Sequence, residues 1–104
     1  MTERSICIIW EFIVNPACRE KFFRIYGPHG DWAQLMARHP GYLGTQLQID
    51  NQNTLRFLTI DRWKSLSDWQ QFKKDFAAEY QAMDQDCTSL TERELFIGHF
   101  SEQP

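Results

Sequence analysis

The chain has 104 residues, of which 42% are hydrophobic and 14% aromatic, enough to build one hydrophobic core. Its 11 Lys and Arg residues are spread along the chain without forming a cluster, against 14 Asp and Glu residues, so no basic patch predicts a nucleic-acid or anionic membrane partner. No apolar run approaches the length of a membrane span, and the polar first five residues do not form a signal peptide. We therefore expect one domain over residues 1–104, located in the cytoplasm.

The three cysteines, Cys7, Cys18 and Cys87, are odd in number and widely separated. They lack the Cys-x-x-Cys or Cys/His spacing from which a local zinc site is built. The sequence predicts reduced thiols and no metal site.

The first part of the chain reads as a strand followed by an interrupted helix. Residues 5–14 are rich in β-branched and aromatic residues, which favour a strand. Asn15 and Pro16 then supply an N-cap and a favoured first helical residue. The segment Gly-Pro-His-Gly at residues 27–30 cannot continue a helix, and Asp31 can cap a second helical segment. We expect a first helix that is broken in the middle.

The second part of the chain predicts a hairpin followed by an amphipathic helix. Residues 42–50 and 54–63 have strand composition and are joined by a short polar turn. Ser65 with Asp68, or Ser67 one register later, can cap the helix that follows. The apolar residues of this helix recur at spacings of three and four, at Trp69, Phe72, Phe76, Tyr80, Met83 and Cys87.

Residues 92–100 complete a fourth strand, so the element order is βαββαβ. This order predicts an α+β, ferredoxin-like fold, with a four-stranded antiparallel sheet and two helices on one face. Both faces of the first strand are nevertheless mostly apolar, whereas a sheet covered on one side should alternate. Four strands of about eight residues present roughly 500 Å² of open face, more than a monomer usually exposes. We therefore expect a homodimer that packs sheet against sheet.

The junction between the third strand and the second helix contains Asp-x-Trp followed by Ser-x-x-x-Trp, at Asp61, Trp63, Ser65 and Trp69. Together with Pro40-Gly41-Tyr42 before the second strand and Gly98 in the last, this pattern resembles the antibiotic biosynthesis monooxygenase superfamily of dimeric α/β barrels. The resemblance spans nearly the whole chain, although its motifs are mostly architectural. It implies one of several functions, because the superfamily includes cofactor-independent oxygenases of phenols, quinols and anthrones, haem-degrading enzymes, and small proteins without an established reaction.

The haem-degrading branch of the superfamily relies on an Asn in the first strand, a Trp early in the second helix and a His further along. Only the Trp has a counterpart here, Trp69, and residues 5–14 contain no Asn. Glu79 and Tyr80 stand near the position of the expected histidine, and a Tyr80 phenolate could in principle bind iron. The resemblance therefore disfavours haem degradation, and we expect no cofactor.

The oxygenase branch would need an apolar cavity between helices and sheet, a base, and polar groups that hold a substrate anion. We predict two candidate catalytic bases, His29 and Asp61. His29 lies in the loop that breaks the first helix, where its side chain can point inward, and an ordinary histidine pKa near 6.5 suits a base. Asp61 shares its strand face with apolar residues, where burial raises the pKa of a carboxyl. A solvated His29 and an Asp61 paired with an Arg or a helix N-terminus are the structural alternatives.

Other polar and aromatic residues are candidates for contact with a substrate. Tyr26 can donate a hydrogen bond to a bound oxygen, and His99 lies beside Gly98, where the missing side chain leaves room for a ligand. Core packing of the aromatic residues and a dimer contact of His99 are the alternatives. The predicted substrate-binding residues are Tyr26, Trp32, Trp63, Trp69, Tyr80 and His99.

Two hypotheses follow from these residues. The first is a cofactor-independent monooxygenase that acts on a small aromatic, phenolic or quinol-like molecule. The second is a non-catalytic dimeric barrel that binds a hydrophobic metabolite or only self-associates. A cavity of roughly a few hundred Å³, lined by at least two of His29, Asp61, His99 and Tyr26, would favour the enzyme. A filled core would favour the second hypothesis.

Overall fold

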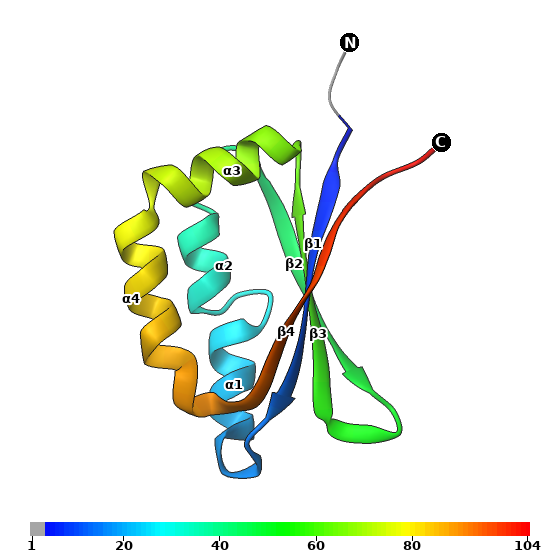
Figure 1. Ribbon diagram of the computed structural model, residues 1–104, viewed down its shortest axis with the longest axis vertical. Helices are drawn as coiled ribbons and strands as arrows, with labels where there is room; N and C mark the ends of the chain where they lie inside the picture. The colour runs from blue at the N-terminus through cyan, green and yellow to red at the C-terminus, as the bar shows by residue number, and fades with distance from the viewer. Residues whose placement is uncertain (1–3) are drawn as a thin grey trace.

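The computed structural model describes residues 4–104, which form four strands with helices on one face of the sheet (Figure 1). The strand order is β2-β3-β1-β4 and all neighbours are antiparallel, which confirms the ferredoxin-like fold. No helix within residues 4–104 is long and apolar enough to cross a membrane. The elements in chain order are β1 (Ile6–Val14), the short 3-10 helix η1 (Pro16–Cys18), α1 (Arg19–Tyr26), α2 (Asp31–Met36), β2 (Tyr42–Asp50), β3 (Asn53–Trp63), α3 (Leu66–Asp75), α4 (Ala77–Cys87), the 3-10 helix η2 (Thr88–Leu90) and β4 (Thr91–Ser101).

The predicted break in the first helix is confirmed, and it separates α1 from α2. The amide of Gly30 donates to the carbonyl oxygen of Gly27 at 3.0 Å, which closes a tight turn. A Cβ atom at Gly30 would lie 2.4 Å from the carbonyl oxygens of Arg24 and Ile25. A side chain at this position would therefore clash with the end of α1, and glycine allows the chain to pass close to it.

The predicted second helix differs from the structure, because it is divided into α3 and α4 at Phe76. The backbone of Phe76 has φ −116° and ψ 27°, outside the helical region. The amide of Phe76 still donates to the carbonyl of Phe72, and the amide of Tyr80 to that of Phe76, so the chain bends without a loop. Figure 1 shows α3 crossing the end of the sheet and α4 running along it. No Gly or Pro lies between residues 66 and 87, so the sequence carries no local signal for this bend.

The core lies between the helices and the inner face of the sheet, in two clusters of buried side chains. One cluster contains Phe12, Phe22 and Phe57, and the other contains Trp63 and Phe72. Trp10, Trp32 and Met83 pack against both clusters and are only partly buried. The interior is therefore least filled between the two clusters, where these three side chains lie.

The outer face of the sheet carries no helix (Figure 1). Cys7, Ile9 and Ile13 of β1 point to this face, since the alternate residues Ile6, Ile8, Phe12 and Val14 are buried under the helices. Leu95 and Phe100 of β4 pair with outer-face residues of β1 and are 41% and 52% exposed. The expectation that both faces of the first strand are mostly apolar is thus met for β1, whereas the second copy that would cover the outer face stays a prediction.

Candidate active site

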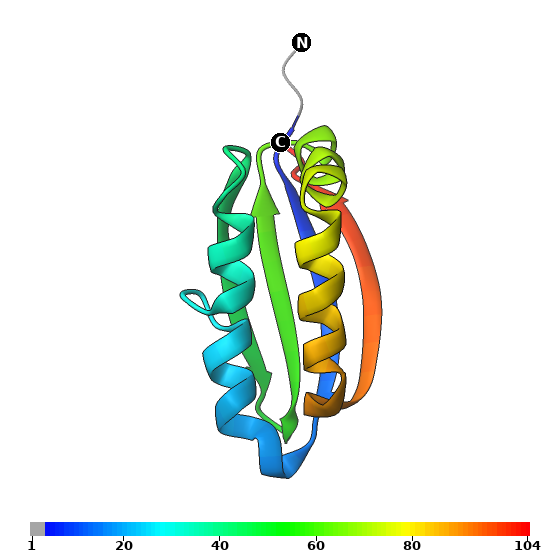
Figure 2. The same ribbon diagram turned by 90° about the vertical axis from the view of Figure 1, so that its left-hand side faces the viewer.

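A recess opens between the helices and the inner face of the sheet. Viewed from the helix side, Figure 2 shows β3 running between the α1–α2 column and α4, and residues from all of these elements line the recess. Three polar residues of β2 and β3, Thr45, Thr59 and Asp61, lie in the wall. The remaining wall is largely aromatic and includes Trp10, Phe12, Tyr26, Trp32, Trp69 and Tyr80.

The recess is partly open and narrow inside. The space inside it, including the open mouth, is about 560 Å³, but the interior available to water is only about 50 Å³. At roughly 10–15 Å³ of such volume per water, the interior holds a few water molecules. The lining meets the expectation for an enzyme, because Asp61 and Tyr26 are both present, but the volume falls short of the expected few hundred Å³. An aromatic ligand would have to displace wall side chains.

Asp61 is the carboxylate of β3 that faces this recess. It projects from β3 between Ile8 of β1 and Thr45 of β2. The hydroxyl of Thr45 donates to Oδ1 of Asp61 at 2.7 Å. Within residues 4–104 no basic side chain forms an ion pair with Asp61, so the alternative of a structural ion pair is not found. Burial raises the pKa of Asp61 to about 6, although the Thr45 hydrogen bond acts to lower it.

The hydrogen bond to Asp61 continues to a second hydroxyl that the sequence analysis missed. The Tyr42 hydroxyl lies 2.5 Å from Oγ1 of Thr45. Because the Thr45 hydrogen points to Asp61, Tyr42 is the donor to Thr45. A register shift in β2 between Tyr42 and Gly44 puts Tyr42 and Thr45 on the same face, although they are three residues apart. Simple alternation along the strand could not have found this pair.

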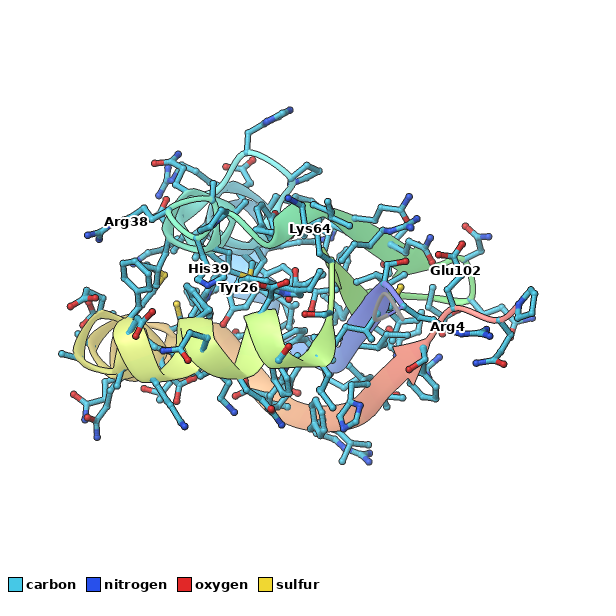
Figure 3. All side chains as sticks on the ribbon, turned by 90° about the horizontal axis from the view of Figure 1, so that it is seen from above. Arg4, Tyr26, Arg38, His39, Lys64 and Glu102 are labelled. Atoms are coloured by element: carbon cyan, nitrogen blue, oxygen red, sulfur yellow. The ribbon has the colours of Figure 1, made fainter. Side chains whose placement is uncertain are left out.

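Two predicted tyrosines line the recess with neutral hydroxyl groups. Figure 3 shows Tyr26 in the interior, where burial, followed by the neighbouring Cys87, raises the pKa of its hydroxyl well above the usual range. Burial and then the charges of Asp84, Asp61 and Glu94 raise the pKa of Tyr80 to about 12. Both hydroxyls therefore keep their protons at neutral pH and can donate hydrogen bonds.

Two predicted tryptophans also line the recess. The rings of Trp32 and Tyr80 meet edge to face at 5.0 Å. The Nε1 hydrogen of Trp32 is buried without a hydrogen-bond partner among residues 4–104. Trp69 stacks on Phe96 of β4 at 6.4 Å, and Nζ of Lys73 lies 4.5 Å from the Trp69 ring centroid.

Three of the predicted residues lie outside the recess. His29 is exposed, because the turn between Gly27 and Gly30 presents it to solvent, so the expectation that it points inward is wrong. Trp63 is fully buried at the end of β3, where it packs against Tyr42 and Phe72 and forms no part of the wall. His99 is exposed on β4, and its ring lies 6.0 Å from that of Trp69.

Two further carboxylates line the recess and were not predicted. Asp84 belongs to α4, and Glu94 of β4 pairs with Phe12 of β1 on the inner face. Burial raises the pKa of Glu94, and the charge of Asp84 raises it further. The described residues, 4–104, contain no group of three or more His, Cys, Asp or Glu side chains arranged to hold a metal ion.

Fold and cavity together define a small ferredoxin-like α+β protein with an aromatic recess between helices and sheet. The family profile for antibiotic biosynthesis monooxygenases matches residues 5–84, and the chain belongs to this family. No curated protein sequence matches the chain.

Solved structures with the same fold cover almost the whole chain. PA3566 from Pseudomonas aeruginosa is 12% identical with a TM-score of 0.72, and the match covers 100% of this chain and 99% of that protein. SO0527 from Shewanella oneidensis is 13% identical with a TM-score of 0.70 and coverages of 96% and 92%. SnoaB from Streptomyces nogalater, a cofactor-independent oxygenase, is 18% identical with a TM-score of 0.65 and coverages of 97% and 95%. At these identities the similarity establishes the shared fold.

Proposed function

We propose that the protein is a cofactor-independent oxygenase that acts on a small aromatic, phenolic or quinol-like substrate. The observation that carries this proposal is Asp61, a carboxylate with a pKa of about 6 in an aromatic recess and without an ion-pair partner among the described residues. A base of this pKa is ionised at neutral pH yet close enough to neutrality to accept a proton. The oxygenase activity of SnoaB, which shares the fold, supports the same class of reaction.

The reaction we propose begins with proton transfer from the substrate to Asp61. The substrate anion passes one electron to O₂, and the two radicals combine to form a peroxide. Asp61 returns its proton to the peroxide, and for a ring CH₂ group loss of water from the hydroperoxide leaves a carbonyl, so that the substrate and O₂ yield a quinone-like product and H₂O. Tyr26, Tyr80 and Trp32 line the recess, and we propose that their O–H and N–H groups donate to the oxygen atoms that become negatively charged.

A second candidate function is supported by the narrow interior of the recess. A non-catalytic dimeric barrel protein would fill this space with its own aromatic side chains, and an interior volume of about 50 Å³ is close to that condition. Substrate entry under the first proposal requires movement of wall residues. Met36 suits this role, because its unbranched side chain has several rotatable bonds.

We also propose that the protein is a homodimer in the cytoplasm, formed through the outer face of the sheet. Apolar side chains on that face, including Ile9 and Leu95, support this arrangement. A second copy would supply the missing layer over the sheet.

Oxygen consumption tests the proposed reaction, measured with a panel of hydroquinones and anthrones. We expect Asp61→Asn to reduce the rate at least tenfold, because an amide cannot accept the substrate proton. The rate of the wild-type protein should rise with pH through about 6 as Asp61 ionises. His29→Ala is the control, since His29 is exposed outside the recess and its loss should leave the rate unchanged.

Equal rates for the wild-type protein and Asp61→Asn would remove Asp61 from the reaction. A tenfold loss in His29→Ala would restore histidine as the candidate base. If no substrate in the panel stimulates oxygen consumption, the non-catalytic function is favoured.

A further inference from the structure

We propose that the recess selects an aromatic molecule carrying a protonated amine, in preference to neutral or anionic aromatic molecules. This inference rests on the proposed function for the position of the aromatic ring beside Asp61. Its own basis is the charge of the wall, to which residues 4–104 contribute three carboxylates and no Lys, Arg or His. The amine would be held near Asp84 and Glu94.

The three carboxylates occupy different depths of the recess. Asp84 and Glu94 are exposed, on α4 and β4, and so lie toward the mouth. Asp61 lies deeper, and its second oxygen, Oδ2, accepts no hydrogen bond from the described part of the chain, residues 4–104. Tyr80 of α4 lines the recess together with all three carboxylates.

The carboxylates near the mouth repel one another, as the effect of Asp84 on the pKa of Glu94 shows. A cation placed between them would relieve this repulsion, whereas an anion would increase it. The faces of Trp32, Trp69 and other wall residues also attract organic cations. Lys73 lies against the ring of Trp69 but does not line the recess.

A bare metal ion fits these carboxylates less well than an organic cation. No three acidic, His or Cys side chains in residues 4–104 converge on a metal-sized site. The negative charge is instead spread along a recess with aromatic walls, which matches an ammonium group joined to an aromatic ring.

Three probes with the same phenol ring and different charges test the inference. Tyramine carries an ammonium group, 4-ethylphenol is neutral, and 3-(4-hydroxyphenyl)propionate carries a carboxylate. Dissociation constants would be measured by titration calorimetry at neutral pH and low salt. We expect tyramine to bind at least tenfold more tightly than 4-ethylphenol, and the propionate to bind more weakly than both. Added NaCl should reduce the preference for tyramine, because salt screens charges near the mouth.

Variants locate the source of the preference. Asp84→Asn and Glu94→Gln should each weaken tyramine binding several-fold and leave the affinity for 4-ethylphenol unchanged. Asp86→Asn and Glu92→Gln are matched controls, because they make the same charge changes on the same elements outside the recess. These controls should retain the full preference.

Equal affinities for tyramine and 4-ethylphenol would overturn the inference, as would an equal loss of tyramine binding in the controls and the recess variants. These results are independent of turnover. A preference for tyramine without oxygen consumption would leave the inference intact and contradict the oxygenase proposal. Oxygen consumption without a preference for tyramine would support the oxygenase proposal and contradict the inference.

Discussion

Asp61 has a pKa of about 6 because burial disfavours its charge more than the Thr45 hydrogen bond favours it. An ordinary Asp in the unfolded chain has a pKa near 3.8. Between these values the folded protein binds the proton more tightly than the unfolded chain does. The free energy of unfolding should therefore decrease as pH rises from about 4 to about 6, and the contribution of Asp61 stays unfavourable above that range.

Asp61→Asn should remove this penalty, because the amide is uncharged and can still accept the Thr45 hydrogen bond. We expect the variant to be more stable than the wild-type protein by up to about 3 kcal/mol at pH near 8, and by much less at pH near 4. Urea denaturation at the two pH values measures the difference. Asp86→Asn, which changes an exposed carboxylate on α4, is the control. A stability difference that is the same at both pH values would contradict the claim that Asp61 is charged and buried in the folded protein at pH near 8.

Thr45 acts on the proposed reaction through Asp61, so it is a positioning residue. Thr45→Val removes the hydroxyl that lowers the pKa of Asp61, and we expect the pKa of Asp61 to rise above its wild-type value. Carboxyl carbon NMR measures this titration directly. Thr45→Ser keeps the hydroxyl and should preserve the wild-type titration. An unchanged Asp61 titration in Thr45→Val would show that the hydrogen bond does not form in solution.

Residue chemistry in the sequence is sufficient to find part of the recess. Strand parity identifies Asp61 and the junction motif identifies Trp69, and both line the recess. The expectation that His29 points inward is wrong, because the sequence indicates a turn between Gly27 and Gly30 but does not show that this turn presents the side chain to solvent. Thr45 is missed because its position depends on the shift in β2 at Gly44, which is set by pairing with β3.

Among the elements, α3 begins where the sequence predicts, because Ser65 is its N-cap and forms two hydrogen bonds with Asp68. Its hydroxyl accepts from the amide of Asp68 at 3.1 Å and lies 2.8 Å from Oδ2 of the same residue. A Cβ atom at Gly41 would lie 2.5 Å from Cβ of Asp68, so the Pro-Gly entry to β2 packs directly against this cap. Two motifs that are far apart in the chain thus form one corner of the fold.

Loss of the cap should destabilise the protein. We expect Ser65→Ala to lower the free energy of unfolding by about 1 kcal/mol, because the amide of Asp68 loses its partner in a partly buried site. Chemical denaturation measures the change. Gln70→Ala, at an exposed position of the same helix, is the control and should have little effect. A cost no larger than that of the control would mean that water replaces the cap.

Local signals locate most element boundaries, whereas tertiary contacts set the bends. β2 spans the predicted residues, and the strand-to-helix cap lies at the predicted serine. The sequence does not predict the bend at Phe76, because Phe76 keeps an apolar side chain at helical spacing and the change lies only in its backbone angles. The spacing of apolar residues indicates which side chains of a helix face the core. A straight and a bent helix can present the same residues to the core, so this spacing does not reveal the bend.

At the scale of the whole molecule, the outer face of the sheet combines apolar side chains with a small group of paired charges. Arg56 binds Glu11 at 2.8 Å and Asp50 at 3.2 Å across this face. Glu11 is only 8% exposed even without a second layer. A partner that covers the face would therefore meet carboxylates that Arg56 already pairs, although the group keeps one excess negative charge, so the pairing only reduces the cost of removing water from it.

The homodimer proposal is tested by the oligomeric state. Light scattering at micromolar concentration should give about twice the chain mass of 12.4 kDa. Ile60 pairs with Ile9 at the centre of the outer face, so Ile60→Glu would place an unpaired charge in the interface and should shift the protein to monomer. Ala78→Glu, on the exposed side of α4, should remain dimeric. A monodisperse monomer for the wild-type chain would contradict the dimer and leave the apolar outer face to be explained by another partner.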